Sequence, residues 1–228
     1  MTSDAAGDED EEAAERLTDA QRALRAQLLA TEHWSLLASR STTQGEVLTR
    51  IAIYLTLVSA GLVLLGILSQ ATGFSGWFGA AAVGILLVLV LLGFITLVRV
   101  YNTATEDLAY VLAMNRLRAA YLDLDPGIGR YLLMGTTEDQ AGIDRTYHPF
   151  FPRPVSQVLG SSMMIITVVT AVVTGLFTGG LCAWLGLPVA AAVAAGIVAA
   201  SVVIGLALRN GYVRYRRSLA ALERLRND

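Results

Sequence analysis

Acidic side chains are the first candidates for chemistry, because paired carboxylates can bind calcium. Asp123 and Asp125 precede a Pro-Gly pair in a segment that superficially resembles a calcium-binding loop. An EF-hand requires a glutamate at about its twelfth position, which is Met134 when the loop is counted from Asp123, and the loop glycine is also misplaced. We therefore interpret these two acids as solvated residues at a helix end.

Histidine and cysteine are too sparse to form a metal site by themselves. His33 and His148 are the only histidines, and Cys182 is the only cysteine. A zinc site needs three or four such ligands, and one cysteine excludes an intramolecular disulfide. The chain also lacks the phosphate-binding loop, the nucleophile elbow and the HExxH pair. We predict no enzyme activity, no metal site and no cofactor.

Hydroxyl groups are the remaining polar candidates, since three threonines recur at intervals of four residues. Thr170, Thr174 and Thr178 share one helical face and are the best candidate for a polar path. Threonine hydroxyls in apolar helices more often donate to a carbonyl of their own helix. The row covers only half of the helix, so we expect no continuous pore in the resting protein.

Small residues follow the same spacing near the end of the chain. Ala192, Gly196 and Ala200 recur at intervals of four. Small residues on one face allow two helices to approach closely in a membrane. We predict that this face is a packing surface, either within one chain or between chains.

The threonine row and the small-residue row lie in two of four long apolar runs of the sequence. The chain of 228 residues is 54% hydrophobic and only 16% charged. The runs contain no Asp, Glu, Lys, Arg or His, and they are Ile51–Ser69, Phe78–Val98, Leu159–Thr178 and Pro188–Leu208. Each is close to the ~20 residues that cross a bilayer as a helix. We predict an all-α fold with a four-transmembrane-helix bundle rather than a soluble bundle.

The arginines indicate how the spans are oriented. All 17 basic residues are arginine, and none lies in a span or in the short turns Gln70–Trp77 and Gly179–Leu187. Positive charge accumulates on the cytoplasmic side, so both termini and the long loop are expected there. The acidic N-terminus does not resemble a signal peptide. We expect a multi-pass protein of the bacterial plasma membrane.

The residues before the first span divide into a tail and a helix. We expect residues 1–14 to be a disordered acidic tail and residues 15–40 to be an amphipathic cytoplasmic helix. Residues 41–43, Ser-Thr-Thr, are expected to break this helix. Thr43 and Glu46 have the spacing of a capping box that would begin the next helix.

The other segments alternate between membrane and cytoplasm. We predict transmembrane hairpins in residues 51–98 and 158–208, separated by a cytoplasmic helical segment and loop in residues 99–157. A C-terminal cytoplasmic helix follows in residues 209–228. The three amphipathic extensions have apolar faces, so we expect them to pack as a small bundle, either on one another or on copies in neighbouring chains.

Two features of residues 99–157 refine this expectation. Glu106 and Asp107 are expected to pair with Arg99 or Arg116 in a structural role. A short helix is expected over Pro126–Met134, and Thr136–Asp139 has the composition of a further helix start.

The end of this loop combines aromatic residues with three prolines, which prevent a helix. Its candidate site residues are Tyr147, His148, Phe150 and Phe151. We interpret them as an interfacial anchor, with a ligand-binding loop as the alternative.

Several cytoplasmic segments resemble a known group of proteins. They are Glu32-His33-Trp34-Ser35-Leu36-Leu37-Ala38, Arg40-Ser41, and Met114-Asn115-Arg116-Leu117-Arg118 with Tyr121. They resemble segments of uncharacterised four-span membrane proteins of high-GC Gram-positive bacteria. The resemblance implies the same architecture and carries no activity.

The sequence leaves more than one class of function open. The main interpretation is a non-enzymatic scaffold, sensor or effector that forms a homo-oligomer, or binds a cytoplasmic protein, through its cytoplasmic helices. The alternative is an oligomeric pore gated from the cytoplasmic bundle, and an interfacial enzyme is third. A pore requires a polar face in a higher oligomer, whereas an enzyme requires a cleft of convergent acids and histidines. The bilayer is an expected partner and nucleic acid is not.

Overall fold

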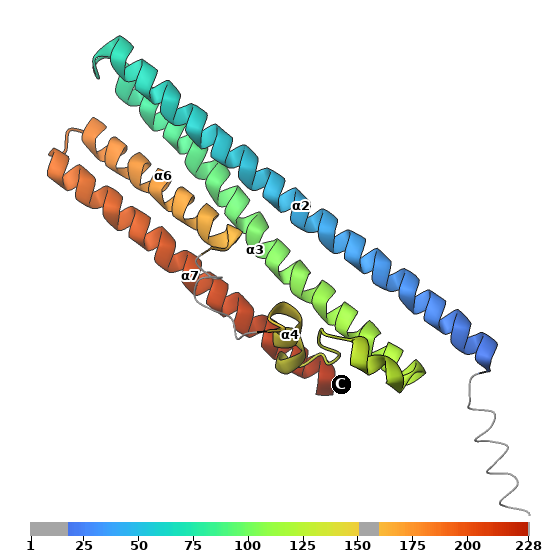
Figure 1. The fold of residues 1–228 in the computed structure, drawn as a ribbon. Coiled ribbons are helices and arrows are strands. Elements are labelled where there is room, and N and C mark those ends of the chain that lie inside the picture. The colour runs from blue at the N-terminus through green and yellow to red at the C-terminus, as the bar shows by residue number, and fades with distance from the viewer. Residues whose placement is uncertain (1–17, 151–159, 228) are drawn as a thin grey trace, which may run out of the picture. The chain divides into compact units, whose positions relative to one another are not determined.

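The computed structural model describes residues 18–150 and 160–227, and the regular structure within them is entirely helical. The elements are α2 (Asp19–Thr72), α3 (Phe78–Leu124), the 3-10 helix η1 (Pro126–Tyr131), α4 (Gln140–Tyr147), α6 (Ser162–Trp184) and α7 (Val189–Asn227) (Figure 1). Four of these described helices, α2, α3, α6 and α7, are long and apolar enough to cross a membrane. The predicted all-α fold with four membrane-spanning helices is confirmed.

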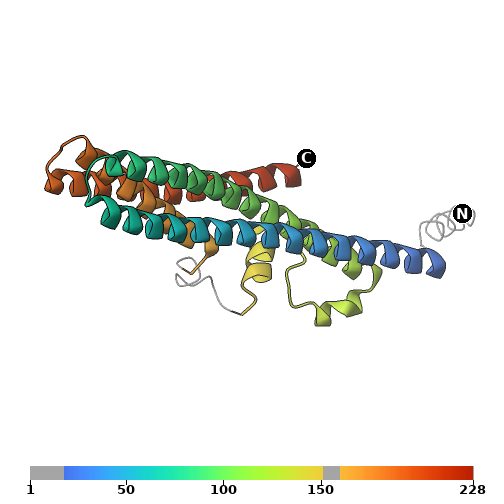
Figure 2. The ribbon, with the colours of Figure 1, turned by 90° about the horizontal axis from the view of Figure 1, so that it is seen from above.

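The chain divides into two compact units. Unit 1 contains Met1–Arg40 and Ala109–Phe150, and unit 2 contains Ser41–Leu108 and Phe151–Asp228. All four apolar runs lie within unit 2, so this unit contains the segments that are apolar enough to cross a membrane. Helices α2 and α3 each supply residues to both units and are continuous in Figure 2.

The predicted helix end near Arg40 is wrong, because α2 continues from Asp19 to Thr72 without interruption. Serine and threonine each cost a helix interior well under ~1 kcal/mol, and residues 41–43 include neither proline nor glycine. The proposed capping box is absent for the same reason. Glu46 instead accepts a hydrogen bond from Arg50 one turn later, at 2.9 Å.

Unit 2 has an apolar interior and an equally apolar exterior. Its core is formed by side chains from α2, α3 and α6, including Val47, Ile51, Val58, Leu86, Leu89, Val90, Leu97, Ile166 and Val173. Large apolar side chains such as Ile67, Ile95 and Ile197 point outward and are exposed. A soluble unit would not expose so much apolar surface, whereas hydrocarbon accommodates it.

The connections between the spans are shorter than predicted. The first lies after α2, where Gly73, Phe74 and Gly76 adopt positive φ angles of 57°, 60° and 60°. The third span is Ser162–Trp184 rather than Leu159–Thr178, so Cys182 belongs to the last turn of α6 and not to a connecting turn. Gly179 and Gly180 lie inside α6 and do not end it. A β-carbon on Gly179 would lie 3.1 Å from the Ala192 carbonyl oxygen of α7. Gly186, with φ 88°, follows the true end.

Unit 1 is built on the first part of α2 and the last part of α3. The less exposed face of α2 here consists of Leu29, His33, Leu36 and Arg40. The helix predicted over Pro126–Met134 is the shorter 3-10 helix η1, and α4 begins after the capping residue Asp139, whose carboxylate accepts from Gly142 N at 2.8 Å.

Some predicted segments are not tested by these residues. The acidic tail of residues 1–14 and Phe151 lie outside the described residues. Packing of the C-terminal extension of α7 against the other two extensions also stays a prediction.

Candidate functional site

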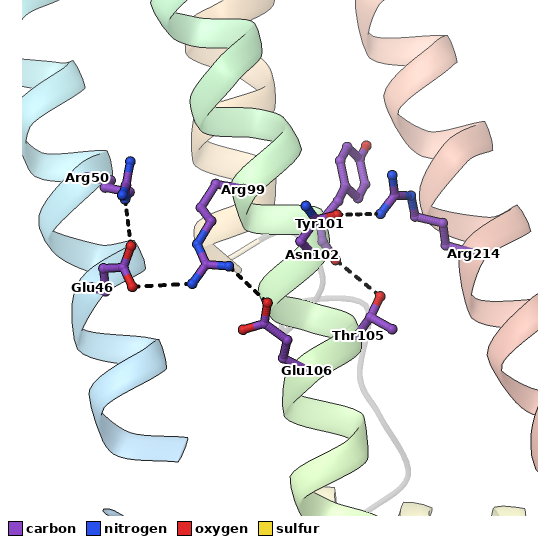
Figure 3. Close-up of polar contacts among 8 residues, drawn as sticks. All are labelled: Glu46, Arg50, Arg99, Tyr101, Asn102, Thr105, Glu106 and Arg214. Atoms are coloured by element: carbon purple, nitrogen blue, oxygen red, sulfur yellow. Dashed lines mark hydrogen bonds and ion pairs between the residues drawn. The ribbon is translucent and has the colours of Figure 1, made fainter. Parts of the chain in front are cut away.

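Polar side chains of α2, α3 and α7 gather in unit 2 where the apolar runs give way to charged sequence (Figure 3). We call this group the polar belt. It consists of Glu46, Arg50, Arg99, Tyr101, Asn102, Glu106 and Arg214. The belt lies near the ends of the apolar runs of α2, α3 and α7, where charged residues begin in the sequence, so it is a natural place for charged contacts.

Alternating charges connect α2 and α3 within the belt. Arg50 Nε lies 2.9 Å from Glu46 Oε1, and Arg99 Nη2 lies 3.3 Å from Glu46 Oε2. Arg99 Nη1 also lies 2.9 Å from Glu106 Oε1, so Glu106 pairs with one of its two predicted partners. Solvent-exposed ion pairs contribute little to stability one by one, but a shared network orders its members together. Arg50, and then Arg99, hold the pKa of the Glu46 carboxyl below its ordinary value.

A second set of contacts connects α3 and α7. The buried Tyr101 hydroxyl donates to the carbonyl oxygen of Ala207 at 2.6 Å. Arg214 donates to Asn102 Oδ1 at 3.0 Å, and its guanidinium carbon lies 5.3 Å from the centroid of the Tyr101 ring. This distance permits a cation–π contact, so Arg214 is fixed on two sides. The belt therefore ties three helices together.

A pair of hydroxyls lies deeper, within the apolar part of unit 2. Tyr54 is 2% exposed and Thr170 is fully buried. Both hydroxyls pack closely against Gly93. A β-carbon built on Gly93 would be 2.5 Å from Tyr54 Oη and 2.9 Å from Thr170 Oγ1. Neither hydroxyl has a hydrogen-bond partner among the described residues. Spans one, two and three thus meet at a close approach that only glycine permits in α3.

The threonine row of α6 faces protein rather than a channel within this chain. Thr174 Oγ1 donates to the Thr170 carbonyl at 2.7 Å, and Thr178 Oγ1 donates to the Thr174 carbonyl at 2.9 Å. These are the backbone contacts expected from the sequence, and burial against Gly93 accounts for Thr170.

The small-residue face of α7 packs on α6, and these helices lie side by side in Figures 1 and 2. A β-carbon on Gly175 would lie 2.8 Å from the Gly196 carbonyl oxygen and 3.2 Å from the Ala200 β-carbon. A β-carbon on Gly179 would lie 3.1 Å from the Ala192 carbonyl oxygen. Sequence reasoning named the α7 face but missed its partner. The Gly-x-x-x-Gly spacing of Gly175 and Gly179 was the available signal.

Asn115 is the centre of a polar network in unit 1. Its side chain is fully buried, and its amide nitrogen donates to the Thr137 carbonyl at 2.9 Å. Its oxygen accepts from Arg118 Nη1 and from Thr146 Oγ1, each at 2.8 Å. A buried amide with all these partners holds the loop before α4 in one arrangement. The sequence did not identify Asn115 as a structural centre.

Neighbouring side chains and burial shift the pKa values of Glu138 and His33 in unit 1. Arg116 binds both oxygens of Glu138, at 2.5 and 2.8 Å, and this holds the pKa of Glu138 below its ordinary value. Arg116 therefore pairs here and not with Glu106 or Asp107. Burial, and then the nearby charge of Arg118, lower the pKa of His33. The His33 ring lies 6.1 Å from the Tyr121 ring between centroids.

The aromatic loop residues differ in their surroundings. Tyr147 ends α4, and the guanidinium of Arg40 lies 5.9 Å from its ring centroid within unit 1. His148 follows as the helix cap, and Phe150 is largely exposed. Their role as an interfacial anchor stays a prediction.

Metal chemistry has no obvious site in the part of the chain that the structure describes. No group of three or more His, Cys, Asp or Glu side chains is arranged to hold a metal ion in residues 18–150 and 160–227. Asp125 is the cap of η1, since its carboxylate accepts from Gly127 N at 2.8 Å. This geometry supports the interpretation of Asp125 as a helix-end acid.

Comparisons with known proteins identify no relative of this chain. No protein-family model, no curated protein and no solved structure matches the chain.

Proposed function

We propose that the chain is a non-enzymatic, multi-pass protein of the bacterial plasma membrane that acts as a homo-oligomeric scaffold, sensor or effector. Both termini lie on the cytoplasmic side in this proposal, as the distribution of arginine favours. The extramembrane parts of α2 and α3 form its binding surface for other proteins. The first partner in this proposal is a second copy of the chain.

One observation carries this proposal, namely the length of α2 and α3. They contain 54 and 47 residues, or ~80 and ~70 Å of helix, whereas the hydrocarbon core is ~30 Å thick. About half of each helix is therefore available outside the bilayer. Holding spans in a membrane does not require such extensions, so they support a role in contact with other proteins.

The exposed side chains of α2 support the same role. Leu24 and Leu28 lie one turn apart on one face and are 58% and 63% exposed, although they precede the first apolar run. Trp34 is 71% exposed in the same segment. Large apolar side chains that face water in a row are a common mark of a protein–protein contact.

The hydroxyl geometry of unit 2 disfavours the alternative of a pore. An ion path needs carbonyls, hydroxyls, charges or retained water along the whole hydrocarbon core. Thr170 is buried on Gly93, and the next two threonines donate to their own helix. The outward faces of the spans are apolar, so this chain offers little for a hydrated path.

The scaffold role is tested by the oligomeric state of the full chain in mild detergent, measured by light scattering. We expect an oligomer that a Leu24→Ser, Leu28→Ser double variant dissociates. A Tyr131→Ser, Leu133→Ser variant is the matched control, because it also removes two exposed apolar side chains of unit 1. A monomeric wild-type protein, or equal effects of both variants, would contradict self-association through α2.

The pore alternative is tested on the same preparation in liposomes that contain a self-quenching dye. We expect no spontaneous release. Release that a Thr170→Val, Thr174→Val, Thr178→Val variant abolishes would support a channel instead.

A further inference from the structure

Helix α7 carries a row of exposed side chains whose character changes where its apolar run ends. The row consists of Val198, Val202, Arg209, Tyr212 and Arg216, at intervals of four, seven, three and four residues. These intervals keep all five on one face of a helix with ~3.6 residues per turn. All five are exposed in unit 2. A lipid-facing apolar row therefore continues directly into two arginines and a tyrosine.

The opposite face of α7 is occupied by protein. Ala192, Val203 and Ala207 are buried there, and Arg214 contacts the ring of Tyr101 and the side chain of Asn102. Arg214 therefore contacts the protein, whereas Arg209 and Arg216 point away from it.

The outward arginines carry charge that no described carboxylate neutralises. Among the residues that the structure describes, neither Arg209 nor Arg216 forms an ion pair. The guanidinium carbon of Arg216 lies 5.9 Å from the ring centroid of Tyr212. An arginine beside a tyrosine forms a surface with positive charge and a hydroxyl donor.

The depth of this surface matches the headgroup region. Arg209 directly follows Leu208, the last residue of the apolar run, and Arg216 lies ~10 Å further along the helix axis. A bilayer of ~30 Å hydrocarbon has headgroup layers that bring it to ~40–45 Å, or roughly 5–8 Å on each side. Arginine side chains extend back toward such a layer, and tyrosine favours it.

We propose that Arg209, Tyr212 and Arg216 bind the phosphate headgroup of an anionic phospholipid. The guanidinium groups donate hydrogen bonds to the phosphate oxygens, and the Tyr212 hydroxyl is a further donor. The acyl chains lie along Val198 and Val202 on the same face. The inference rests on insertion of the four spans into a membrane and not on the scaffold role.

Native mass spectrometry of the delipidated full chain tests this surface. Phosphatidylglycerol and phosphatidylcholine with identical acyl chains are titrated separately onto the wild-type protein. We expect tighter binding of phosphatidylglycerol. An Arg209→Gln, Arg216→Gln variant should lose about 5- to 30-fold in affinity for it, since each basic residue near anionic lipid contributes about fivefold.

The matched control is Arg22→Gln, Arg25→Gln, which also removes two exposed arginines but lies in unit 1 far along the sequence from α7. This control should bind phosphatidylglycerol as wild type does, and Arg209→Lys, Arg216→Lys should retain most of the affinity. Equal affinity of wild type and the Gln variant, or equal loss in the control, would overturn the proposal. If the Gln variant does not fold, Tyr212→Ala provides the same comparison. If the Leu24→Ser, Leu28→Ser variant loses its oligomer but binds phosphatidylglycerol as wild type does, the defect concerns the scaffold role alone.

Discussion

Gly175 of α6 and Gly196 of α7 approach each other so closely that neither position has room for a β-carbon. Such a carbon on Gly175 would lie 2.8 Å from the Gly196 carbonyl oxygen, and one on Gly196 would lie 2.7 Å from the Gly175 carbonyl oxygen. The clash is with backbone in both directions, so a side-chain rotation cannot relieve it. The contact between the last two spans therefore depends on glycine at both sites.

Replacing Gly196 with alanine should lower the thermal stability of the detergent-solubilised protein by about 1–3 kcal/mol, the usual cost of overpacking. The matched control is Gly205→Ala in the same helix, where a β-carbon has no neighbour within 4 Å. Alanine favours helix over glycine by up to ~1 kcal/mol, so the control should be neutral or stabilising. Gly196→Leu should have a larger effect. Equal melting temperatures of the two alanine variants would rule out the close contact.

Gly93→Ala should separate the first three spans where Tyr54 and Thr170 meet. The new β-carbon would lie 2.5 Å from Tyr54 Oη and 2.9 Å from Thr170 Oγ1, so both buried side chains must move. We expect a loss of about 1–3 kcal/mol in thermal unfolding. Gly84→Ala in the same helix is the control, because its β-carbon would meet no atom within 4 Å. A variant of Gly93 that is as stable as the control would contradict this geometry.

Tyr101→Phe should weaken the contact between α3 and α7. It removes the hydroxyl that donates to the Ala207 carbonyl at 2.6 Å and leaves the ring beneath Arg214. The expected loss is about 1 kcal/mol, as for one buried hydrogen bond. Tyr131→Phe removes the same atom from a largely exposed ring and should have no measurable effect. A comparable loss in both variants would show that the bond to Ala207 is not the cause.

Stability should fall as the pH is lowered through the titration of His33. Burial, followed by the charge of Arg118, places the folded-state pKa of His33 below its ordinary value of 6.5. The unfolded chain then binds more protons, so this contribution is present above pH 6.5 and is lost as the pH falls through the folded-state pKa. His33→Gln should flatten the pH dependence of the melting temperature below pH 6.5. The two proteins should behave alike between pH 7 and 8, and an unchanged acid slope in the variant would disprove the assignment.

The orientation of the spans is testable through the single thiol, Cys182, which lies in the last turn of α6. In the proposed topology this turn is on the outer side, so a membrane-impermeant maleimide should label intact cells. An Ala30→Cys, Cys182→Ala variant should be labelled only after the cells are opened, because the proposed topology places Ala30 of α2 on the cytoplasmic side. Labelling of this variant on intact cells would reverse the topology.

The amino-acid sequence determined the class of protein, because a hydrophobic span is a local property. Each apolar run is long enough to cross a bilayer whatever its neighbours are, and a long helix of the structure covers most of each run. Helix ends were less predictable. Ser41 and its two threonine neighbours disfavour a helix only weakly, so the helical segments before and after them form one continuous helix.

Only the tertiary structure decided which residues meet across the helices. The spacing of Gly196 with its small neighbours indicates a packing face but does not say that Gly175 opposes it. In the same way, nothing in the local sequence of Tyr54, Gly93 or Thr170 shows that they share one contact. Pairings of this kind depend on the rotation and depth of each helix, and these are set by the packing of all the spans together.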